Sequence, residues 1–180
     1  MTQKETTFRI AGIGGQGIVL AGYILGNAAT IYEKKYALFT RQYGPEARGA
    51  NCYSSVIVSD QPILYPIICS PSIYICMSKK AFDADNACTV TPETIICTDK
   101  NVDISVCSSR RYSVAADLEA RHIGSRMVAN MVMLGYVTAL TGLIRKESMI
   151  ESIHSAVEQQ YLPLNLAAFN RGFSLYTSEL

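Results

Sequence analysis

Apolar residues fall into short runs along the first part of the chain and into longer runs toward its end. Short runs rich in β-branched side chains and bounded by turn residues indicate buried strands. The expected strands are residues 7–11, 36–40, 51–59, 72–77, 94–98 and 104–108. A further extended piece at 63–68 is interrupted by Pro66, which cannot donate to a strand ladder.

The longer runs predict helices, most of them after the last strand. Ser78 and Ser125 are suited to cap two of them, because a serine hydroxyl accepts from the free amides of a helix start. The expected helices are residues 18–32, 78–82, 113–119, 127–143, 146–159 and 164–176. A strand–helix–strand start followed by further strands and then helices favours an α/β layer sandwich, with a mixed, mostly parallel sheet and C-terminal helices.

Glycines join the first expected strand to the first helix. Gly12, Gly14 and Gly17 have G-x-G-x-x-G spacing, and such a turn lets the backbone approach a phosphate that the helix N-terminus attracts. We therefore expect Gly12, Gly14, Gly15, Gln16 and Gly17 to shape an anion-binding turn. The alternative is a plain strand-to-helix connection. Gly22 and Gly26, one turn apart, would let the helix lie close to the sheet or to another helix.

The end of the second expected strand limits the choice of nucleotide. A site for NAD needs an acidic residue there to hold the ribose hydroxyls, whereas this chain has Thr40 and Arg41. NADP, coenzyme A or no nucleotide remain. We expect a polar loop at 41–50, in which Arg41 and Arg48 contact an anion or the carboxylate of a partner, since arginine suits both. A solvated connection is the alternative.

Few residues are candidates for other chemistry. The six cysteines form no C-x-x-C pair and the two histidines lie far downstream of them, so we expect no metal site and no catalytic residue. A net charge of +1 argues against nucleic acid as a partner. Most of the cysteines lie in apolar runs, where a free cysteine behaves as a small buried hydrophobe, so we expect a reducing, cytoplasmic location. The uncharged runs 10–32 and 127–144 contain glycines and amides, so we expect buried helices and no membrane span.

Several motifs occur together in a characteristic order. They are GIGGQG at 12–17, YGPEARG at 43–49, DQPILYP at 60–66, MSKKA at 77–81 and NMVMLG at 130–135. With these motifs the chain resembles the γ subunits of 2-oxoacid:ferredoxin (acceptor) oxidoreductases, most closely the 2-oxoglutarate branch. The resemblance covers most of the chain and implies one γ-type domain over residues 1–180 with a three-layer, Rossmann-like fold.

The resemblance also implies a function. Complexes of this family oxidatively decarboxylate 2-oxoacids and form an acyl-CoA, which would be succinyl-CoA from 2-oxoglutarate. Thiamine diphosphate, magnesium and iron–sulfur clusters would lie in α, β and δ-type partner subunits, and electrons would leave to ferredoxin or a flavodoxin-like acceptor. Coenzyme A would lie at the subunit interface near the glycine turn, Arg41 and Arg48. The isolated chain would be inactive and could form a homodimer.

Other functions remain open at this point. They are a free-standing module that binds NADP or another nucleotide, and a ligand-free scaffold subunit of a pyruvate, 2-oxoisovalerate or indolepyruvate oxidoreductase. Two positions depart from the family pattern: Ala50 replaces the second glycine of an R-G-G sequence, and Ser72 stands where an aspartate often precedes the strand. The loop of indolepyruvate enzymes diverges from Y-G-P-E-A-R-G.

Overall fold

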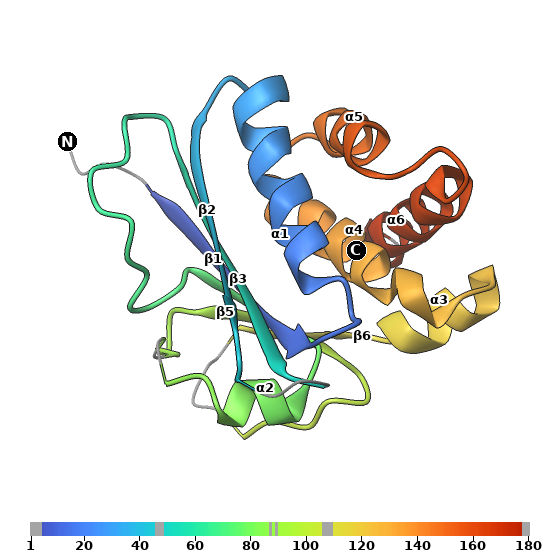
Figure 1. Cartoon of the computed structure of the whole chain (residues 1–180), viewed down its shortest axis with the longest axis horizontal. Helices are drawn as coiled ribbons and strands as arrows, with labels where there is room; N and C mark the ends of the chain where they lie inside the picture. Colours follow the sequence, from blue (N-terminus) through green and yellow to red (C-terminus); the bar gives the residue numbers. More distant parts are fainter. Residues whose placement is uncertain (1–4, 46–48, 87, 89, 106–109, 178–180) are drawn as a thin grey trace.

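A six-stranded mixed sheet lies at the centre of the computed structural model (Figure 1), which describes residues 5–45, 49–86, 88, 90–105 and 110–177. Its order is β2-β3-β1-β4-β5-β6. The strands are β1 (Thr6–Ile13), β2 (Tyr36–Tyr43), β3 (Asn51–Ser59), β4 (Ile73–Cys76), β5 (Ile95–Asp99) and β6 (Arg111–Val114). Only β3, among the described strands, runs against the others, because it is antiparallel to both β1 and β2 while the remaining pairings are parallel.

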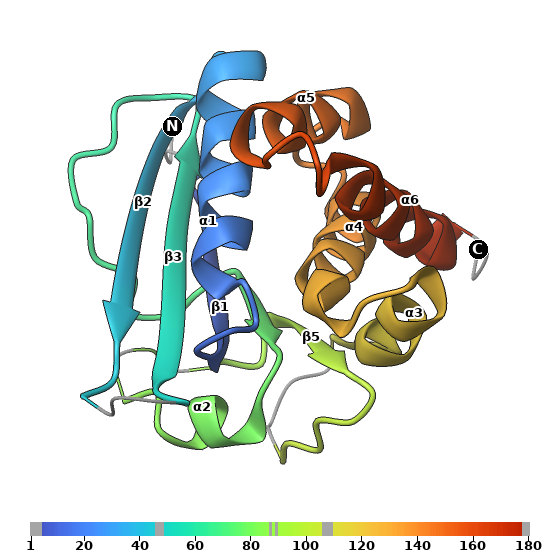
Figure 2. The same cartoon turned by 45° about the vertical axis from the view of Figure 1, so that its right-hand side comes forward.

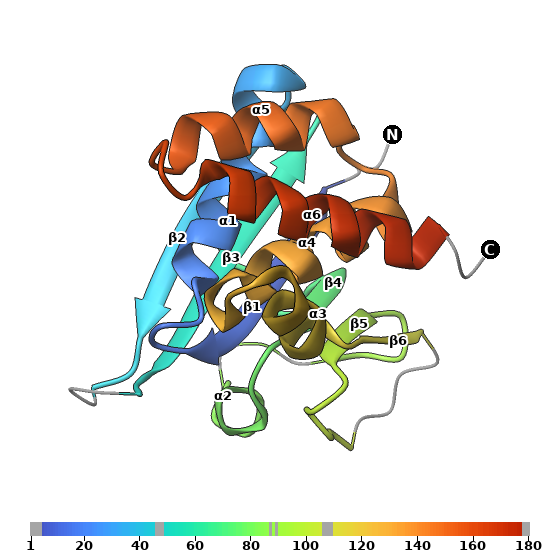
Figure 3. The same ribbon diagram turned by 90° about the vertical axis from the view of Figure 1, so that its right-hand side faces the viewer.

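Most helices cover one face of this sheet, as Figure 2 shows. Helix α1 lies against β3 and β2, and α3, α4, α5 and α6 complete the layer. Figure 3 looks onto this layer, with α6 in front of the sheet. Among the described residues, the other face carries α2 and connecting segments (Figure 1). The helices are α1 (Ile18–Asn27), continued as a π-helix (Ala28–Tyr32), α2 (Lys79–Asp83), α3 (Ala116–Ile123), a 3-10 turn (Arg126–Val128), α4 (Ala129–Thr141), α5 (Lys146–Ala156) and α6 (Leu162–Thr177).

The helix-covered face holds the larger core, in which Phe8 and Ile10 of β1 contact the helices. The opposite face is organised around a buried ion pair. Nε and Nη2 of Arg9 donate to the two carboxylate oxygens of Asp85, at 2.8 and 2.7 Å, and Tyr74 donates to the same carboxylate at 2.8 Å. The Arg9 guanidinium also lies 4.4 Å from the centre of the Tyr53 ring. This pair joins the segment that follows α2 to strand β1.

The sequence predicted most elements, and the structure confirms the α/β layer architecture with its mixed sheet and C-terminal helices. Ser78 caps α2, as expected, by accepting from the Ala81 amide. Ser125 caps the 3-10 turn before α4. The first departure is at residues 41–43, which belong to β2 instead of a loop. The extended piece at 63–68, interrupted by Pro66, forms no strand.

The last expected strand, 104–108, is wrong for its first two residues, and residues 106–108 lie outside the described part of the chain. The strand forms later, at Arg111–Val114, where it pairs with β5. The departure from the family pattern at Ser72 has a structural role. Ser72 and Thr7 exchange hydrogen bonds between backbone amides and hydroxyls, at 3.2 and 2.9 Å, and so join the starts of β4 and β1.

Helices α4 and α6 approach each other at two glycines. A Cβ added to Gly135 of α4 would lie within 3.0 Å of the Phe169 carbonyl oxygen, and one added to Gly172 of α6 would lie equally close to the Val132 carbonyl. Each glycine therefore faces the backbone of the other helix. Backbone atoms cannot move aside as a flexible side chain can, so the crossing tolerates no side chain at either position.

We predict that Gly135→Ala lowers the free energy of unfolding by about 3 kcal/mol, because the added methyl forces α4 and α6 apart. Urea unfolding of the full chain measures this. Gly26→Ala in α1 is the matched control. Its Cβ would meet Phe39 at 3.6 Å and Val56 at 3.8 Å, which is ordinary contact, and alanine favours a helix by up to about 1 kcal/mol. Equal losses in the two variants would contradict the prediction.

Candidate functional site

The glycine turn follows β1 and is held in shape by Gln16. The Gln16 side chain accepts from the Ile13 amide at 2.8 Å and donates to the Met77 carbonyl at 3.0 Å. It therefore joins the carboxyl ends of β1 and β4. After β1 the chain turns to the helix-covered face, whereas after β4 it turns to the α2 face, so this is the kind of switch point at which open α/β sheets bind ligands.

Gly12 and the backbone of Ala50 complete the turn. A Cβ on Gly12 would lie 2.5 Å from Ile18 and 2.7 Å from the Gln16 amide oxygen. The space beside Gly12 is thus filled by the side chains of Ile18 and Gln16, and not left open for a ligand. The Ala50 carbonyl accepts from the Gly14 amide at 2.9 Å, so the close backbone approach exists although alanine replaces the family's second glycine.

Several backbone amides at the head of α1 have no acceptor within the described part of the chain. Ala21 is the first helix residue whose amide bonds to a carbonyl, that of Gly17 at 2.9 Å. The amides without an acceptor are those of Gly15, Gly17, Ile18, Val19 and Leu20. No side chain caps this helix and its first turn has no acidic residue. A helix start of this kind attracts anions.

Gly17 is held from the other side by Asn130. The Asn130 side chain is buried and donates to the Gly17 carbonyl at 3.1 Å. It leaves the amides of the turn uncovered, because its hydrogen bond goes to the carbonyl. Gly17 has a left-handed backbone with φ of 68°, which favours glycine.

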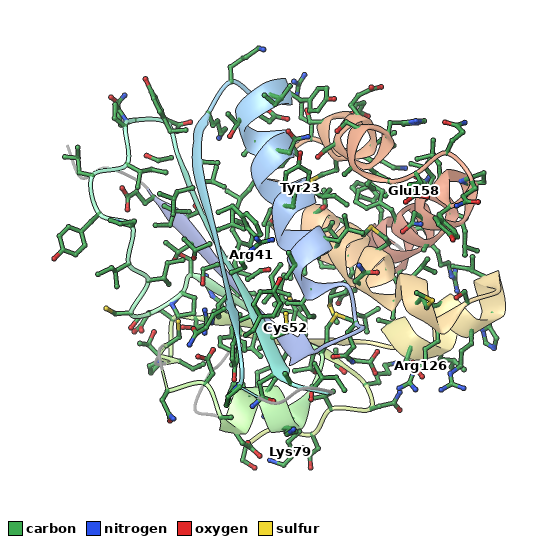
Figure 4. All side chains as sticks on the ribbon, viewed as in Figure 1. Tyr23, Arg41, Cys52, Lys79, Arg126 and Glu158 are labelled. Atoms are coloured by element: carbon green, nitrogen blue, oxygen red, sulfur yellow. The ribbon has the colours of Figure 1, made fainter. Side chains whose placement is uncertain are left out.

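Three cavities meet at Gly15. The largest, about 590 Å³, lies between α1 and the outer strands and is lined by Tyr23, Phe39, Arg41 and Tyr43 together with the turn. Figure 4 labels Tyr23 on α1, Arg41 on β2 and Cys52 on β3 around this cavity. The Arg41 side chain is exposed. The cavity therefore combines free amides, a cation and aromatic rings.

The other two cavities adjoin Met127, which lines both of them. One, about 270 Å³, lies between the turn, Met77 and Asp117. The second, about 430 Å³, lies between the turn and the connection from α5 to α6, which includes Glu158 and Tyr161. Figure 4 labels Glu158 and Arg126 on this helical side of the molecule.

The structure brings most of the predicted site residues together. Gly14, Gly15, Gln16 and Gly17 form the turn, whereas Gly12 lies within β1 next to it. Gly14, Gly15 and Gly17 line the same cavity as Arg41. Arg48 lies outside the described residues. Gly22 lies close to the sheet as expected, since its Cβ would be 2.6 Å from that of Ser54. Whether these residues bind a ligand stays a prediction.

The sequence pointed less clearly to the remaining residues of the site. Asn130 belongs to one of the family motifs and is a single amide at the start of an otherwise apolar helix, which is a weak signal for a site residue. Tyr23 gave no signal, because a tyrosine in an apolar helix is typical of a core. The strand order weakens the dinucleotide alternative, because β3 separates β2 from β1, whereas the second strand is adjacent to the first in that fold.

Within the described residues there is no group of three potential metal-ligating side chains. No helix in that part of the chain is long and apolar enough to cross a bilayer.

Comparisons with known proteins identify similar chains. A family model described as pyruvate ferredoxin/flavodoxin oxidoreductase matches residues 7–175. The 2-oxoglutarate synthase subunit KorC of Methanocaldococcus jannaschii is 38% identical over 174 residues, which are 93% of this chain and 91% of that one. The crystal structure of the keto/oxoacid ferredoxin oxidoreductase γ subunit from Geobacter sulfurreducens matches with a TM-score of 0.86 and 30% identity, over 97% and 98% of the two chains.

A third similarity concerns the fold alone. The 2-oxoglutarate:ferredoxin oxidoreductase from Magnetococcus marinus, solved with 2-oxoglutarate, coenzyme A and succinyl-CoA bound, matches with a TM-score of 0.84 at 19% identity. The match covers 98% of this chain and 32% of that one. The same fold therefore occurs there as one part of a longer polypeptide.

The Asp117 carboxylate beside the turn gives a pH prediction. It accepts from Arg121 and Arg126 at 2.9 and 2.5 Å. Burial alone would raise the pKa of Asp117, but the two arginine contacts outweigh it and hold the pKa below its ordinary 3.8. A depressed pKa stabilises the fold above the unfolded-state value, and the gain is lost as the pH falls below 3.8.

We predict that Asp117→Asn is less stable than the parent chain by about 1 kcal/mol at pH 7, a small value because the arginines are exposed. The difference should disappear as the pH falls below about 4. Thermal unfolding of both chains from pH 7 to pH 3 measures it. Asp60→Asn is the control, since that carboxylate is 74% exposed and its removal should change little. A constant difference at every pH would contradict the prediction.

Proposed function

Because the chain belongs to the pyruvate ferredoxin/flavodoxin oxidoreductase family, we propose that it is the γ-type subunit of a complex that oxidises 2-oxoglutarate to succinyl-CoA. The observation that carries this proposal is the 38% identity with a 2-oxoglutarate synthase subunit along nearly the full length of both chains. In the reaction the coenzyme A thiol becomes acylated, carbon dioxide is released and electrons pass to ferredoxin or a flavodoxin-like acceptor.

The redox chemistry belongs to other subunits in this proposal. Thiamine diphosphate needs a magnesium site and an iron–sulfur cluster needs cysteine ligands, and the described residues of this chain offer no such group. The partners are α, β and δ-type subunits, and the whole of residues 1–180 acts as one domain. This chain contributes the binding and orientation of coenzyme A at the interface.

The glycine turn and Arg41 are the proposed site for coenzyme A phosphates. The free amides of Gly15, Gly17, Ile18, Val19 and Leu20 supply donors, and Arg41 in the same cavity supplies a positive charge. Tyr23 and Tyr43 offer aromatic surface to the adenine ring. Arg48, four residues after Gly44 in the adjoining loop, either joins this site or contacts a neighbouring subunit.

The choice of 2-oxoacid substrate can be tested with the native complex. Affinity purification with this chain as bait, followed by assays of coenzyme A-dependent dye reduction, should give the highest kcat/KM with 2-oxoglutarate among several 2-oxoacids. Preference for pyruvate or 2-oxoisovalerate would assign the chain to another branch of the family. Tight binding of NADPH by the chain, without such an activity, would favour a nucleotide-binding module.

We predict that Arg41→Ala raises the KM for coenzyme A about tenfold in the assembled complex, since a charge-assisted contact contributes about 1.5–3 kcal/mol. The kcat at saturating coenzyme A should change little, because the reacting groups lie elsewhere. Steady-state kinetics with coenzyme A as the varied substrate measures both. Lys100→Ala is the control, because it removes an exposed positive charge that follows β5. An unchanged KM in Arg41→Ala would remove this residue from the site.

A further inference from the structure

Both polar atoms of the buried Asn130 side chain form hydrogen bonds, although Asn130 lies in an otherwise apolar helix. Asn130 lies at the start of α4 and is 3% exposed. Its Nδ2 donates to the Gly17 carbonyl at 3.1 Å, and its Oδ1 accepts from the Met131 amide at 3.0 Å. One side chain thus links the glycine turn to α4, across 113 residues of sequence.

Asn130 and Gly17 are matched in shape. A Cβ added to Gly17 would overlap the Asn130 side-chain amide. The asparagine therefore fills the space that any other residue at position 17 would need. The left-handed φ of 68° at Gly17 adds a second reason for glycine.

The hydrogen bond from Asn130 helps to fix the peptide unit between Gly17 and Ile18 at the head of α1. The Gly17 carbonyl and the Ile18 amide belong to one planar trans peptide unit and point in opposite directions. Fixing the carbonyl toward α4 therefore aims the Ile18 amide away from it, out of the head of α1. The carbonyl also accepts from Ala21 at 2.9 Å, so the first helical turn is fixed at the same point.

We propose that Asn130 is a positioning residue for the anion-binding turn: it orients the amides at the head of α1 toward the ligand without contacting the ligand itself. This inference rests on the proposed function, because it assumes that the turn holds coenzyme A. The motif at 130–135 then has two roles, since Asn130 positions the turn and Gly135 permits the close contact of α4 with α6.

Asn27 provides a matched control on the same helix. It lies at the last residue of α1 and donates to the hydroxyls of Ser152 and Ser155 on α5, at 3.0 and 3.1 Å. Like Asn130, it attaches α1 to a C-terminal helix through a side-chain amide. It differs in lying at the end of α1 opposite to the glycine turn.

The experiment compares Asn130→Asp, Asn130→Ser and Asn27→Asp in the assembled complex. Aspartate has the size of asparagine but presents a carboxylate to the Gly17 carbonyl in place of a donor. We expect the KM for coenzyme A to rise at least about tenfold in Asn130→Asp and about threefold in the neutral Asn130→Ser. The kcat should stay within about twofold, and Asn27→Asp should keep the KM of the parent complex.

The outcomes separate this inference from the proposed function. A raised KM in Arg41→Ala with a parental KM in both Asn130 variants overturns the positioning role alone. Parental KM values in Arg41→Ala and in both Asn130 variants overturn the coenzyme A site itself. An equal rise in Asn27→Asp overturns the inference by showing general loosening of α1. If Asn130→Asp does not assemble, Asn130→Ser decides by the same criteria.

Discussion

The close contact between α4 and α6 fixes the position of α4 and, through Asn130, that of the glycine turn. Gly135 and Gly172 each face the backbone of the opposite helix, so the distance between these helices is set by the main chain and cannot be adjusted by side-chain rotation. Helix α4 in turn carries Asn130 to the Gly17 carbonyl. The position of the glycine turn therefore depends on helices that follow it by more than one hundred residues.

The antiparallel strand β3 determines where β2, which carries Arg41, lies relative to the glycine turn. Because β3 lies between β1 and β2, the pairing places Tyr43, Cys52 and Gly12 in one row across three strands. Strands β2 and β1 are then about 10 Å apart, twice the usual spacing of neighbours. The cavity beside α1 is therefore lined by Arg41 and Tyr43 of β2, by Cys52 of β3 and by the turn.

Much of this architecture could be predicted from the sequence, because periodicity and turn residues are local signals. Strand 51–59 was predicted with its observed bounds. The glycine turn was placed correctly between a strand and a helix, although Gly12 and Ile13 belong to the strand. The strand at Arg111–Val114 was missed, since its short polar run is specified by pairing with β5. The buried pair of Arg9 and Asp85 was missed for a related reason: residues 76 positions apart carry no shared local pattern.

The glycine fingerprint shows how far such a pattern can indicate a ligand. Gly12 and Gly17 are required by the side chains of Ile18, Gln16 and Asn130, so their presence would be explained with no ligand at all. Gly15 has a positive φ of 94°, which by itself favours glycine, and Gly14 has only the Ala50 carbonyl near it and lines the cavities. Binding must therefore be argued from the uncovered amides at the head of α1 and from Arg41. The sequence spacing is the same in either case, which is why it could predict the turn but could not separate packing from recognition.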